Sequence, residues 1–434
     1  MAPAMPDLPP GPMGPQVMPG PATMPPASLA GEMPVYPDPA QPGAPGALPP
    51  LGTSGAEARV ALLLPLSGRH AEIGQGMLQA AQLALFEVAG PNFTLLPYDT
   101  RGTPEGAAAA AQRALDERAQ LILGPLLADE VRAVSPLAAA RGVATVAFSN
   151  SRGVAGDGTF IMGFVPRDQV ATIVDYAVAN NLRRIALLAP NDAYGGAVRD
   201  ALQAAAAARG ASVARMQFYP AGGSDFTPEV KLISEYDARR QALLRHRSEL
   251  AAAGDDASRQ ALRRLENADT FGDPGYDAIL LPGTGQELRG LVALLSFYDV
   301  DQPQVRFLGL RNWDDVPNLW NEPALVGAWY AAPPPDERQK FIERYQRAYG
   351  RQPARLASLA YDATALAAVL AQSPDGPDFS FRALTNPNGF IGVDGLFRLR
   401  ADGVAERSFA IMQVRRGDAR PLRNASDTFQ GLIN

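Results

Sequence analysis

The chain has 434 residues, 47% of them hydrophobic, which is enough for two or three globular domains. A net charge of −6 leaves no basic surface of the kind that binds nucleic acid, so that class of function is excluded. The absence of cysteine excludes disulfides, thiolate metal sites and a cysteine nucleophile. His70 and His246 are the only histidines and lie in unrelated contexts, so we expect neither a metal centre nor a histidine acid–base relay.

Residues 1–57 differ from the rest of the chain in composition. Pro-Pro, Gly-Pro and Pro-Gly steps recur there, charges are few, and Tyr36 is the only aromatic residue. Such a segment cannot bury enough apolar surface to offset the loss of chain entropy, so it is predicted to be disordered. It lacks the basic start and apolar core of a secretory signal. We interpret it either as a tether between an upstream anchor and the folded domain or as an extension without a role.

No apolar run in the chain reaches the roughly 18–20 residues that span a bilayer. Strands and helices alternate instead in residues 58–166. An apolar run of strand length from Val60 is followed by a loop rich in Gly and Ser, and then by a helix with apolar residues three and four apart. The predicted elements that follow are strand 93–99, helix 104–118, strand 121–125, helix 129–141, strand 143–148 and strand 160–164. This alternation is typical of a parallel sheet covered on both faces, and it defines a first lobe.

The same pattern starts again in residues 167–327 and predicts a second lobe. Asp168 is expected to cap a helix that runs to Asn180. The predicted elements that follow are strand 184–190, a helix to Arg209, strand 212–219, helix 226–235, strand 276–282, helix 286–298 and strand 305–309. This segment is therefore a second α/β unit of the same design.

A charged insertion, residues 236–274, interrupts the second lobe. Arginines and acidic residues alternate there with Ala and Leu, which predicts one or two surface helices broken near Gly254. Two interpretations stay open, namely a solvated helical insertion and an arm that docks a partner.

Residues 328–404 are predicted to return to the first lobe, and residues 405–434 to supply a closing strand and a C-terminal tail. The elements expected in this part are strand 328–332, helices 336–349 and 356–372, and strands 390–398 and 408–414. The fold class is thus predicted to be α/β, with two lobes that are each a parallel sheet flanked by helices.

One glycine pattern suggests a dinucleotide site but has the wrong spacing. Gly74 and Gly76 precede a predicted helix, and Asp99 ends the next strand where a ribose-binding acid would lie. Residues 65–73 separate the strand from these glycines, whereas in a dinucleotide fold the glycines form the turn itself. An NAD(P)-dependent enzyme is therefore the least favoured function. No nucleophile or metal motif occurs in the sequence, so we expect no enzyme activity, cofactor or metal.

Polar residues follow several of the predicted strands and are the candidate ligand-binding residues. They are Ser67, Gly68, Ser149, Asn150, Ser151, Tyr194, Thr284 and Arg311. If the lobes face each other, these residues converge on one cleft, because ligands of α/β folds bind at the carboxyl ends of strands. Hydroxyl and backbone N–H groups suit a carboxylate or amide, and an arginine suits an anion. The alternative is that each of them caps a helix or fills a turn.

Several short pieces of the chain occur together in one protein family. These pieces are Pro65-Leu-Ser-Gly68 with Gly74, Tyr98-Asp99-Thr100 with Pro104, Leu123-Gly124-Pro125, Asn191-Asp-Ala-Tyr194-Gly195, Phe226 and Tyr361-Asp362. As a set they resemble the type I periplasmic binding proteins, in particular the leucine/isoleucine/valine-binding branch, over about residues 58–415. The resemblance implies two lobes that close by a hinge around a small solute, which an ABC permease then imports.

A narrower set of pieces resembles the bacterial penicillin-binding protein activators. It consists of Leu281-Pro-Gly-Thr-Gly-Gln-Glu-Leu-Arg289, Asn312-Trp-Asp314 and Arg355-Leu-Ala-Ser-Leu-Ala-Tyr-Asp362, and the charged insertion also fits this set. This resemblance implies a non-enzymatic periplasmic protein, lipid-anchored in the cell envelope, whose partner is a peptidoglycan synthase.

Three departures from the amino-acid receptors bear on the ligand. Ile73 stands where those receptors carry an aromatic residue, and Ala128 lies near the position of their serine after the third strand. Arg311 aligns with the acid that meets the ligand ammonium, and two cations repel. We therefore expect an activator of a peptidoglycan synthase, with the alternative of an ABC importer subunit that binds branched-chain amino acids or related small anions.

Overall fold

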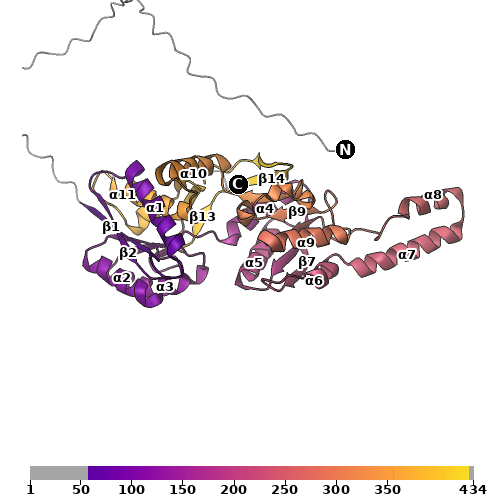
Figure 1. The fold of residues 1–434 in the computed structure, drawn as a ribbon, viewed down its shortest axis with the longest axis horizontal. Helices are drawn as coiled ribbons and strands as arrows, with labels where there is room; N and C mark the ends of the chain where they lie inside the picture. Colours follow the sequence, from indigo (N-terminus) through magenta and orange to yellow (C-terminus); the bar gives the residue numbers. More distant parts are fainter. Residues whose placement is uncertain (1–56, 355, 430–434) are drawn as a thin grey trace, which may run out of the picture. The chain divides into compact units, whose positions relative to one another are not determined.

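Two large β-sheets organise residues 57–354 and 356–429, which are the residues that the computed structural model describes. The expected disordered tether, residues 1–57, lies outside them except for Glu57, and so does the end of the expected C-terminal tail. The two sheets and their helices form the two predicted lobes, and Figure 1 shows the elements of each.

The sheet of lobe 1 has five parallel strands in the order β2-β1-β3-β4-β5. Their bounds are β1 Ala58–Leu64, β2 Phe93–Asp99, β3 Leu121–Leu123, β4 Ala144–Ala147 and β5 Thr159–Ile161. The helices between them are α1 Ala71–Val88, α2 Pro104–Asp116 and α3 Ala128–Ala140, with the short 3₁₀ turn η1 Arg152–Val154 before β5. The all-parallel sheet predicted for this lobe is confirmed.

The central strand β1 explains why this sheet is covered on both faces. Leu62 and Leu64 pack with α1 and with a helix from the C-terminal part of the chain, α11. Ala61 and Leu63 pack instead with α2 and α3. A strand buried on both faces needs a continuous apolar run rather than an alternating one, which is the pattern of β1.

The second part of lobe 1 comes from residues after the second lobe. Its helices are α10 Pro335–Tyr349, α11 Ala357–Ala371 and α12 Phe381–Leu384. A small antiparallel sheet, in the order β11-β12-β13, follows with the bounds β11 Phe390–Gly392, β12 Gly395–Leu399 and β13 Ala405–Arg407. Phe341 and Tyr345 of α10 pack against Ala80 and Ala84 of α1, which fixes α10 to lobe 1.

The sheet of lobe 2 has seven strands in the order β15-β14-β10-β9-β8-β6-β7. Their bounds are β6 Arg184–Pro190, β7 Ser212–Tyr219, β8 Ala278–Leu280, β9 Arg306–Gly309, β10 Trp329–Ala332, β14 Ala410–Arg415 and β15 Asp418–Arg423. Strands β14 and β15 pair antiparallel, so this sheet is mixed rather than purely parallel. A short turn suffices to join antiparallel strands, and β14 and β15 form such a hairpin.

Helices cover both faces of the sheet in lobe 2 as well. They are α4 Pro166–Ala179 and α5 Ala193–Ala208 on one face, and α6 Thr227–Ile233 and α9 Gly285–Phe297 on the other. Three 3₁₀ turns connect β9 to β10, namely η2 Arg311–Asp315, η3 Leu319–Asn321 and η4 Pro323–Leu325.

The charged insertion forms a helical pair, α7 Tyr236–Ala253 and α8 Asp256–Leu265, which Figure 1 shows extending away from the sheet of lobe 2. The predicted break is confirmed, because Gly254 ends α7 with a φ of 65° and Asp255 caps α8 through its side chain. Most residues of the pair are exposed, and Leu243 is one of its few buried side chains. We refer to residues 236–269 as the arm.

The chain passes between the lobes three times: after β5, after β10 and after β13. The prediction that residues 328–404 all return to lobe 1 is wrong at its start, since β10 pairs with β9 and β14 in lobe 2. Strands β14 and β15, Ala410–Arg415 and Asp418–Arg423, also belong to lobe 2. The hydrophobic pattern identified these strands but carries no information on which sheet a strand joins.

Candidate functional site

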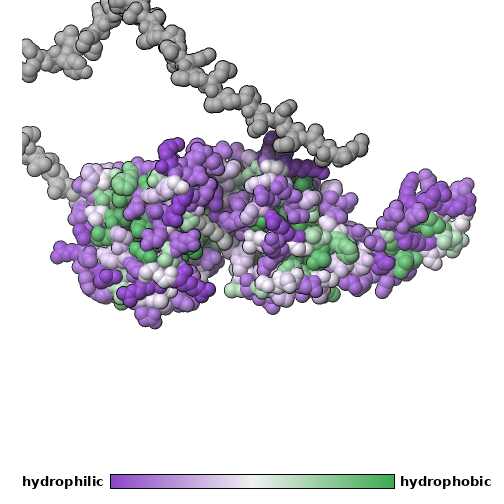
Figure 2. Space-filling view, in the orientation of Figure 1, coloured by the Kyte–Doolittle hydropathy of each residue, from purple (hydrophilic) through white to green (hydrophobic). Residues whose placement is uncertain are grey.

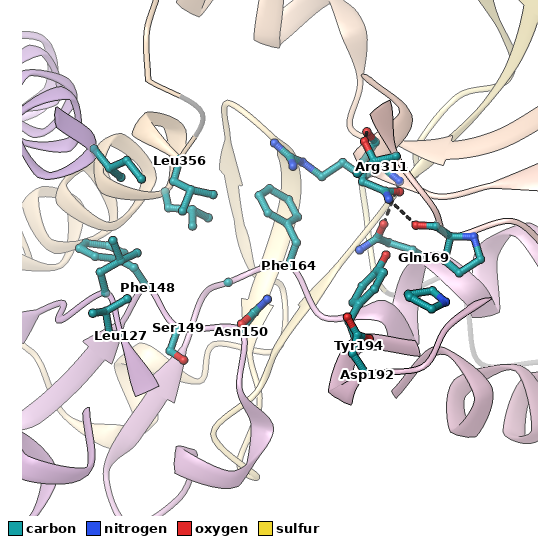
Figure 3. Close-up of a pocket in the computed structure, with 18 of the residues that line it drawn as sticks. Leu127, Phe148, Ser149, Asn150, Phe164, Gln169, Asp192, Tyr194, Arg311 and Leu356 are labelled. Carbon is teal, nitrogen blue, oxygen red and sulfur yellow. Dashed lines mark hydrogen bonds between the residues drawn. The ribbon is translucent and has the colours of Figure 1, made fainter. Parts of the chain in front are cut away.

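A cavity of about 580 Å³ lies between the two lobes, at the carboxyl ends of β3, β4, β6, β8 and β9. This volume is within the range of small-molecule sites. The lining residues are His70, Ile73, Leu126, Leu127, Phe148, Ser149, Asn150, Gly163, Phe164, Gln169, Pro190, Asp192, Tyr194, Ala221, Pro282, Gly283, Thr284, Glu287, Arg311, Asn312, Leu356 and Leu359. Figure 3 shows most of these side chains around the cavity.

Lobe 1 supplies a mainly apolar wall. Leu127 follows β3, Phe148 follows β4, and Leu356 precedes α11, so three separate segments place apolar side chains side by side (Figure 3). The polar members from β4 are Ser149 and Asn150, and the Ser149 Oγ accepts a hydrogen bond from the Ser151 N–H at 3.1 Å. This wall suits the hydrocarbon part of a ligand.

The close approach of β4 and β5 shapes this wall. Gly163 N–H donates to the Ser149 carbonyl at 3.1 Å, and a Cβ at position 163 would lie 2.4 Å from that oxygen. No other residue type fits that contact without movement of the backbone. Gly163 therefore sets the position of Ser149 and Asn150 at the cavity.

Lobe 2 supplies a mainly polar wall. The Asp192 carboxylate caps α5 by accepting the Gly195 N–H at 2.8 Å, which places Tyr194 at the start of that helix. Thr284 precedes α9 and donates its hydroxyl to the Asn312 carbonyl at 3.3 Å. Glu287 accepts the Gly222 N–H at 2.9 Å. Both carboxylates are thus held by backbone amides while still lining the cavity.

Arg311, in the 3₁₀ turn after β9, is the only lysine or arginine among the described residues that line the cavity. Its backbone N–H donates to the Gln169 Oε1 at 2.9 Å, and its guanidinium carbon lies 4.1 Å from the centre of the Phe164 ring. Figure 3 shows the side chain extending from lobe 2 across that ring. The pair is a cation–π contact, which holds the planar group in place.

The guanidinium of Arg311 is buried and only partly satisfied. The residue is 4% exposed, and Nη1 lies 3.4 Å from the Asp315 Oδ2. Nε and Nη2 are buried without a hydrogen-bond partner in residues 57–354 and 356–429. Burial lowers the pKa of Arg311, but an arginine remains protonated at any ordinary pH. The wall of the cavity therefore contains a buried positive charge whose Nε and Nη2 lack a hydrogen-bond partner among the described residues.

Five of the eight predicted site residues line the cavity: Ser149, Asn150, Tyr194, Thr284 and Arg311. Ser67, Gly68 and Ser151 are not among the described lining residues. The Ser67 hydroxyl donates to the Asp99 Oδ2 at 2.6 Å, so it closes the loop onto β2 instead. Although burial alone would raise it, the pKa of Asp99 is lowered by hydrogen bonds from Ser67 and its neighbours. Gly68, with a φ of 78°, belongs to the same turn.

Phe148, Phe164 and Gln169 line the cavity and were not predicted from the sequence. Phe148 directly precedes Ser149, so the same strand-end argument could have found it. Gln169 lies 142 positions from its partner Arg311, and no local pattern signals such a contact. It lies in the first turn of α4, next to Asp168, which does not cap that helix as expected but accepts the Arg407 N–H at 3.0 Å.

The glycines that suggested a dinucleotide site serve packing. Gly74 and Gly76 lie inside α1, which begins at Ala71, so they form no turn before the helix. A Cβ on Gly74 would lie 2.1 Å from the Pro65 carbonyl, and one on Gly76 would lie 2.4 Å from the Ala354 Cβ. Close contact with neighbouring segments therefore explains both residues.

The described residues contain no group of His, Asp and Glu side chains that could hold a metal ion. No helix in the same part of the chain is long and apolar enough to cross a membrane.

Two α/β lobes that are joined by three segments and enclose a ligand-sized cavity define a two-lobe binding protein. Residues 57–419, most of the chain, match the model of the family described as periplasmic binding protein, and the chain belongs to this family. The predicted type I periplasmic-binding-protein fold is thereby confirmed.

Solved structures with the same fold are solute-binding proteins of ABC transporters. The leucine-binding protein LivK of Thermotoga maritima is 21% identical, with 85% of this chain and 99% of that chain covered and a TM-score of 0.52. A putative branched-chain amino acid ABC transporter protein from Rhodospirillum rubrum is 18% identical, with 84% and 100% covered and a TM-score of 0.66. A solute-binding protein from Rhodopseudomonas palustris, solved with 3,4-dihydroxybenzoic acid, is 16% identical, with 86% and 97% covered and a TM-score of 0.55.

Among curated proteins, the uncharacterized protein RP748 of Rickettsia prowazekii is 24% identical over 164 residues. That match covers 38% of this chain and 43% of the Rickettsia protein, so it spans less than half of either.

Proposed function

We propose that this protein binds a small organic carboxylate with an apolar body in the cavity between its lobes, as the periplasmic solute-binding subunit of an ABC importer. The observation that supports this most directly is that two buried nitrogens of Arg311, Nε and Nη2, have no hydrogen-bond partner among the described residues. A buried charge whose hydrogen-bond donors are not all satisfied destabilises a protein, so a site that retains one suits a ligand of opposite charge. Nε and one Nη form the side of the guanidinium that binds a carboxylate through two parallel hydrogen bonds.

The apolar wall of lobe 1 supports the second half of the proposal. Ile73, Leu127, Phe148, Leu356 and Leu359 face the same cavity as Arg311. A ligand with its carboxylate on Arg311 directs its hydrocarbon part toward these side chains. Ser149, Asn150, Tyr194 and Thr284 then supply further hydrogen bonds to the ligand's polar edge.

An ordinary amino acid is the competing ligand. Asp192 and Glu287 line the polar wall and would attract an ammonium group. Their carboxylates already accept backbone N–H groups of Gly195 and Gly222, whereas the Nε and Nη2 of Arg311 lack partners among the described residues. We therefore favour the carboxylate without the ammonium.

Two matched pairs of ligands test this proposal. 4-Methylpentanoate and leucine differ in the ammonium group, and benzoate and benzamide differ in the negative charge. Calorimetry and thermal shift with the full chain should show binding of 4-methylpentanoate or benzoate and little binding of benzamide. A ligand at a hundred times its Kd adds about 2.7 kcal/mol to the stability. Tighter binding of leucine than of 4-methylpentanoate, or no binding of any carboxylate, would contradict the proposal.

Activation of a peptidoglycan synthase by surface contact is the second candidate, and the arm is the observation that favours it. Leu244 on α7 is 55% exposed, and Phe271 and Leu232 near its base are also exposed. Figure 2 shows both hydrophilic and hydrophobic surface on this part of lobe 2. An exposed apolar surface with surrounding charges suits a protein partner. Such a role would place the protein at the cell envelope, where a lipid anchor would hold it near the synthase.

Replacing residues 241–269 with a short Gly-Ser linker tests this second candidate. The Phe271 N–H donates to the Arg239 carbonyl at 3.2 Å, so the two ends of the arm meet and the linker can be short. Arg239 is kept because it donates to the carbonyls of Gly272, Ser234 and Tyr298 and anchors the base. Loss of synthase stimulation with unchanged melting temperature is expected; unchanged stimulation would remove the arm as a docking element. The Arg311→Met chain serves as the control with an intact arm.

A further inference from the structure

A chain of alternating charges runs from the cavity through lobe 2 to lobe 1. The Arg311 Nη1 lies 3.4 Å from the Asp315 Oδ2, and the Asp315 Oδ1 lies 3.9 Å from the Arg338 Nη2. The Arg338 Nη1 in turn lies 3.3 Å from the Asp394 Oδ1. Two arginines and two aspartates thus connect the ligand-facing guanidinium to the far side of the hinge.

The members of this chain belong to different lobes. Asp315 ends η2, whose Trp313 and neighbouring Val316 belong to the core of lobe 2. Arg338 lies on α10, which packs against α1 of lobe 1, and Asp394 lies in the turn between β11 and β12. The contact between Asp315 and Arg338 therefore joins the two lobes, whereas the contact between Arg338 and Asp394 lies within lobe 1.

Arg338 is the adjustable member of the chain. Its side chain is 24% exposed, while that of Asp394 is fully buried in a turn. It lies closer to Asp394 than to Asp315, so the interlobe contact is the weaker one in this conformation. A movement of Arg338 toward Asp315 would strengthen the contact between the lobes.

We propose that these residues form an ion-pair switch, in which an anion bound to Arg311 frees Asp315 to pair with Arg338 and so holds the liganded conformation. The proposal rests on the carboxylate site described above. A ligand carboxylate on Nε and Nη2 neutralises Arg311 and repels the nearby Asp315 carboxylate. Asp315 then gains more from Arg338 than from Arg311, and the pair that joins the lobes becomes the favoured one. Arg338 and Asp315 act as positioning residues because they reach the ligand only through Arg311.

The other two connections between the lobes are held together separately. Arg407, the last residue of β13, donates its Nη2–H to the Met162 carbonyl at 3.1 Å and its N–H to Asp168 at 3.0 Å. Its guanidinium lies 4.8 Å from the Phe164 ring, on which Arg311 also stacks. These contacts join the connection after β5 to the connection after β13. The Asp315–Arg338 contact is therefore positioned to control the remaining connection, which follows β10.

The absence of cysteine from the sequence allows a direct test by paired spin labels. Ala139 on α3 and Ala197 on α5 are exposed and lie in different lobes, so Ala139→Cys and Ala197→Cys supply the labelling sites. Pulsed electron paramagnetic resonance gives the distribution of interlobe distances with and without benzoate as the probe anion. Benzoate should shift this distribution in the parent chain.

Two substitutions should act in opposite directions. Asp394→Asn weakens the ion pair between Arg338 and residue 394 of lobe 1. The distribution of interlobe distances without ligand should therefore move toward the distribution with benzoate bound. Arg338→Met removes the interlobe pair, so benzoate should bind about tenfold more weakly, a change of 1.4 kcal/mol, and should no longer shift the distances. Arg347→Met, on the exposed face of the same helix, is the matched control and should behave as the parent chain.

The outcomes separate this switch from the carboxylate site. If benzoate fails to bind the parent chain, the proposed ligand is wrong, but the ligand-free comparison of Asp394→Asn with the parent still tests the switch. The switch is overturned if Asp394→Asn and Arg338→Met both give the distance distributions of the Arg347→Met control. Melting curves of each labelled chain establish that the variants are folded.

Discussion

The two walls of the cavity differ in chemistry although the lobes share one architecture. The wall of lobe 1 is built from apolar side chains that also belong to the core of that lobe, as Phe148 does. The wall of lobe 2 is built from polar side chains on helix starts and a 3₁₀ turn, with Arg311 as its positive charge. Under the proposed function, lobe 1 recognises the ligand by shape and lobe 2 recognises it by charge.

The same difference determines what each wall contributes to stability. Burying Phe148 stabilises lobe 1, because the hydrophobic effect favours its removal from water. Burying the Arg311 guanidinium while its Nε and Nη2 lack partners among the described residues destabilises lobe 2 in the absence of an anion. Substitutions in the two walls should therefore affect folding and binding in different proportions, and the predictions below test this.

Phe148→Ala should give the largest effect and should act on the fold. The side chain is 2% exposed in the core of lobe 1, and removal of such a buried aromatic ring costs about 3–5 kcal/mol. Urea denaturation should show the lower free energy of unfolding, and affinity for benzoate should fall as well. A variant of unchanged stability would show that the apolar wall does not belong to the core.

Arg311→Met should give the next largest effect and should act on binding alone. Loss of a buried charged partner weakens carboxylate binding by about 2–4 kcal/mol, measured by calorimetry with benzoate. The melting temperature without ligand should stay the same or rise, because an unsatisfied buried charge is removed. Arg199→Met, on the surface of α5, is the control of equal charge change. A large loss of stability with unchanged affinity would reverse the roles assigned to the two walls.

Asp362→Asn, in α11 of lobe 1, should change the pH dependence of stability. Burial and the neighbouring Asp394 raise the pKa of Asp362 from 3.8 to about 7. Between these pH values the folded protein holds a proton that the unfolded chain has lost, so the contribution to stability falls as the pH rises toward 7. Asparagine lacks this dependence and can still accept the Val393 N–H.

The charged groups around Asp362 set the design of this measurement. They are Asp394, Arg407, Arg338, Glu337, Arg344 and, through Tyr361, Glu87. The melting temperature of Asp362→Asn relative to the parent should be higher by a few degrees at pH 7.5 than at pH 4.5. A difference in melting temperature between Asp362→Asn and the parent that is the same at every pH would contradict the raised pKa of Asp362.

Thr284→Val should give the smallest effect. The Thr284 hydroxyl makes one hydrogen bond, to the Asn312 carbonyl, at an exposed position. A net contribution of about 0.5–1.5 kcal/mol is usual for such a bond, and exposure places this one at the low end. The loss of affinity for benzoate in Thr284→Val should be smaller than the loss in Arg311→Met. An equal loss of affinity in the two variants would mean that the Arg311 charge is not the main contribution of the polar wall to binding.

The rule that ligand residues follow strands explains which site residues were predictable. Asn150 lies in the loop that follows β4 and Tyr194 at the start of the helix that follows β6, and both line the cavity. The rule fails at Ser67, because a strand end also has to build a turn and the Asp99 acceptors lie 32 positions away. Sequence patterns describe neighbours along the chain, whereas the hydrogen-bond partner of a loop residue is set by the sheet.

The fold was predictable to the level of the lobes but not of their connections. Continuous apolar runs such as β1 indicate strands covered on both faces, and the structure confirms this. The sheet to which β10 belongs depends on pairing with β9, which nothing in its own four residues specifies. Contacts between distant segments of lobe 2, such as Gln169 with Arg311, depend on the same long-range arrangement.

The arm has one practical consequence that follows from the geometry of its base. Because the backbone at Arg239 and Phe271 meets through a hydrogen bond, the intervening residues enter and leave lobe 2 at one point. A fluorescent protein whose own termini lie close together could replace residues 241–269 without forcing the lobe apart. The lobe that carries Arg311 would then carry an optical reporter, and a change in fluorescence on addition of a carboxylate would turn the protein into a sensor for its own ligand.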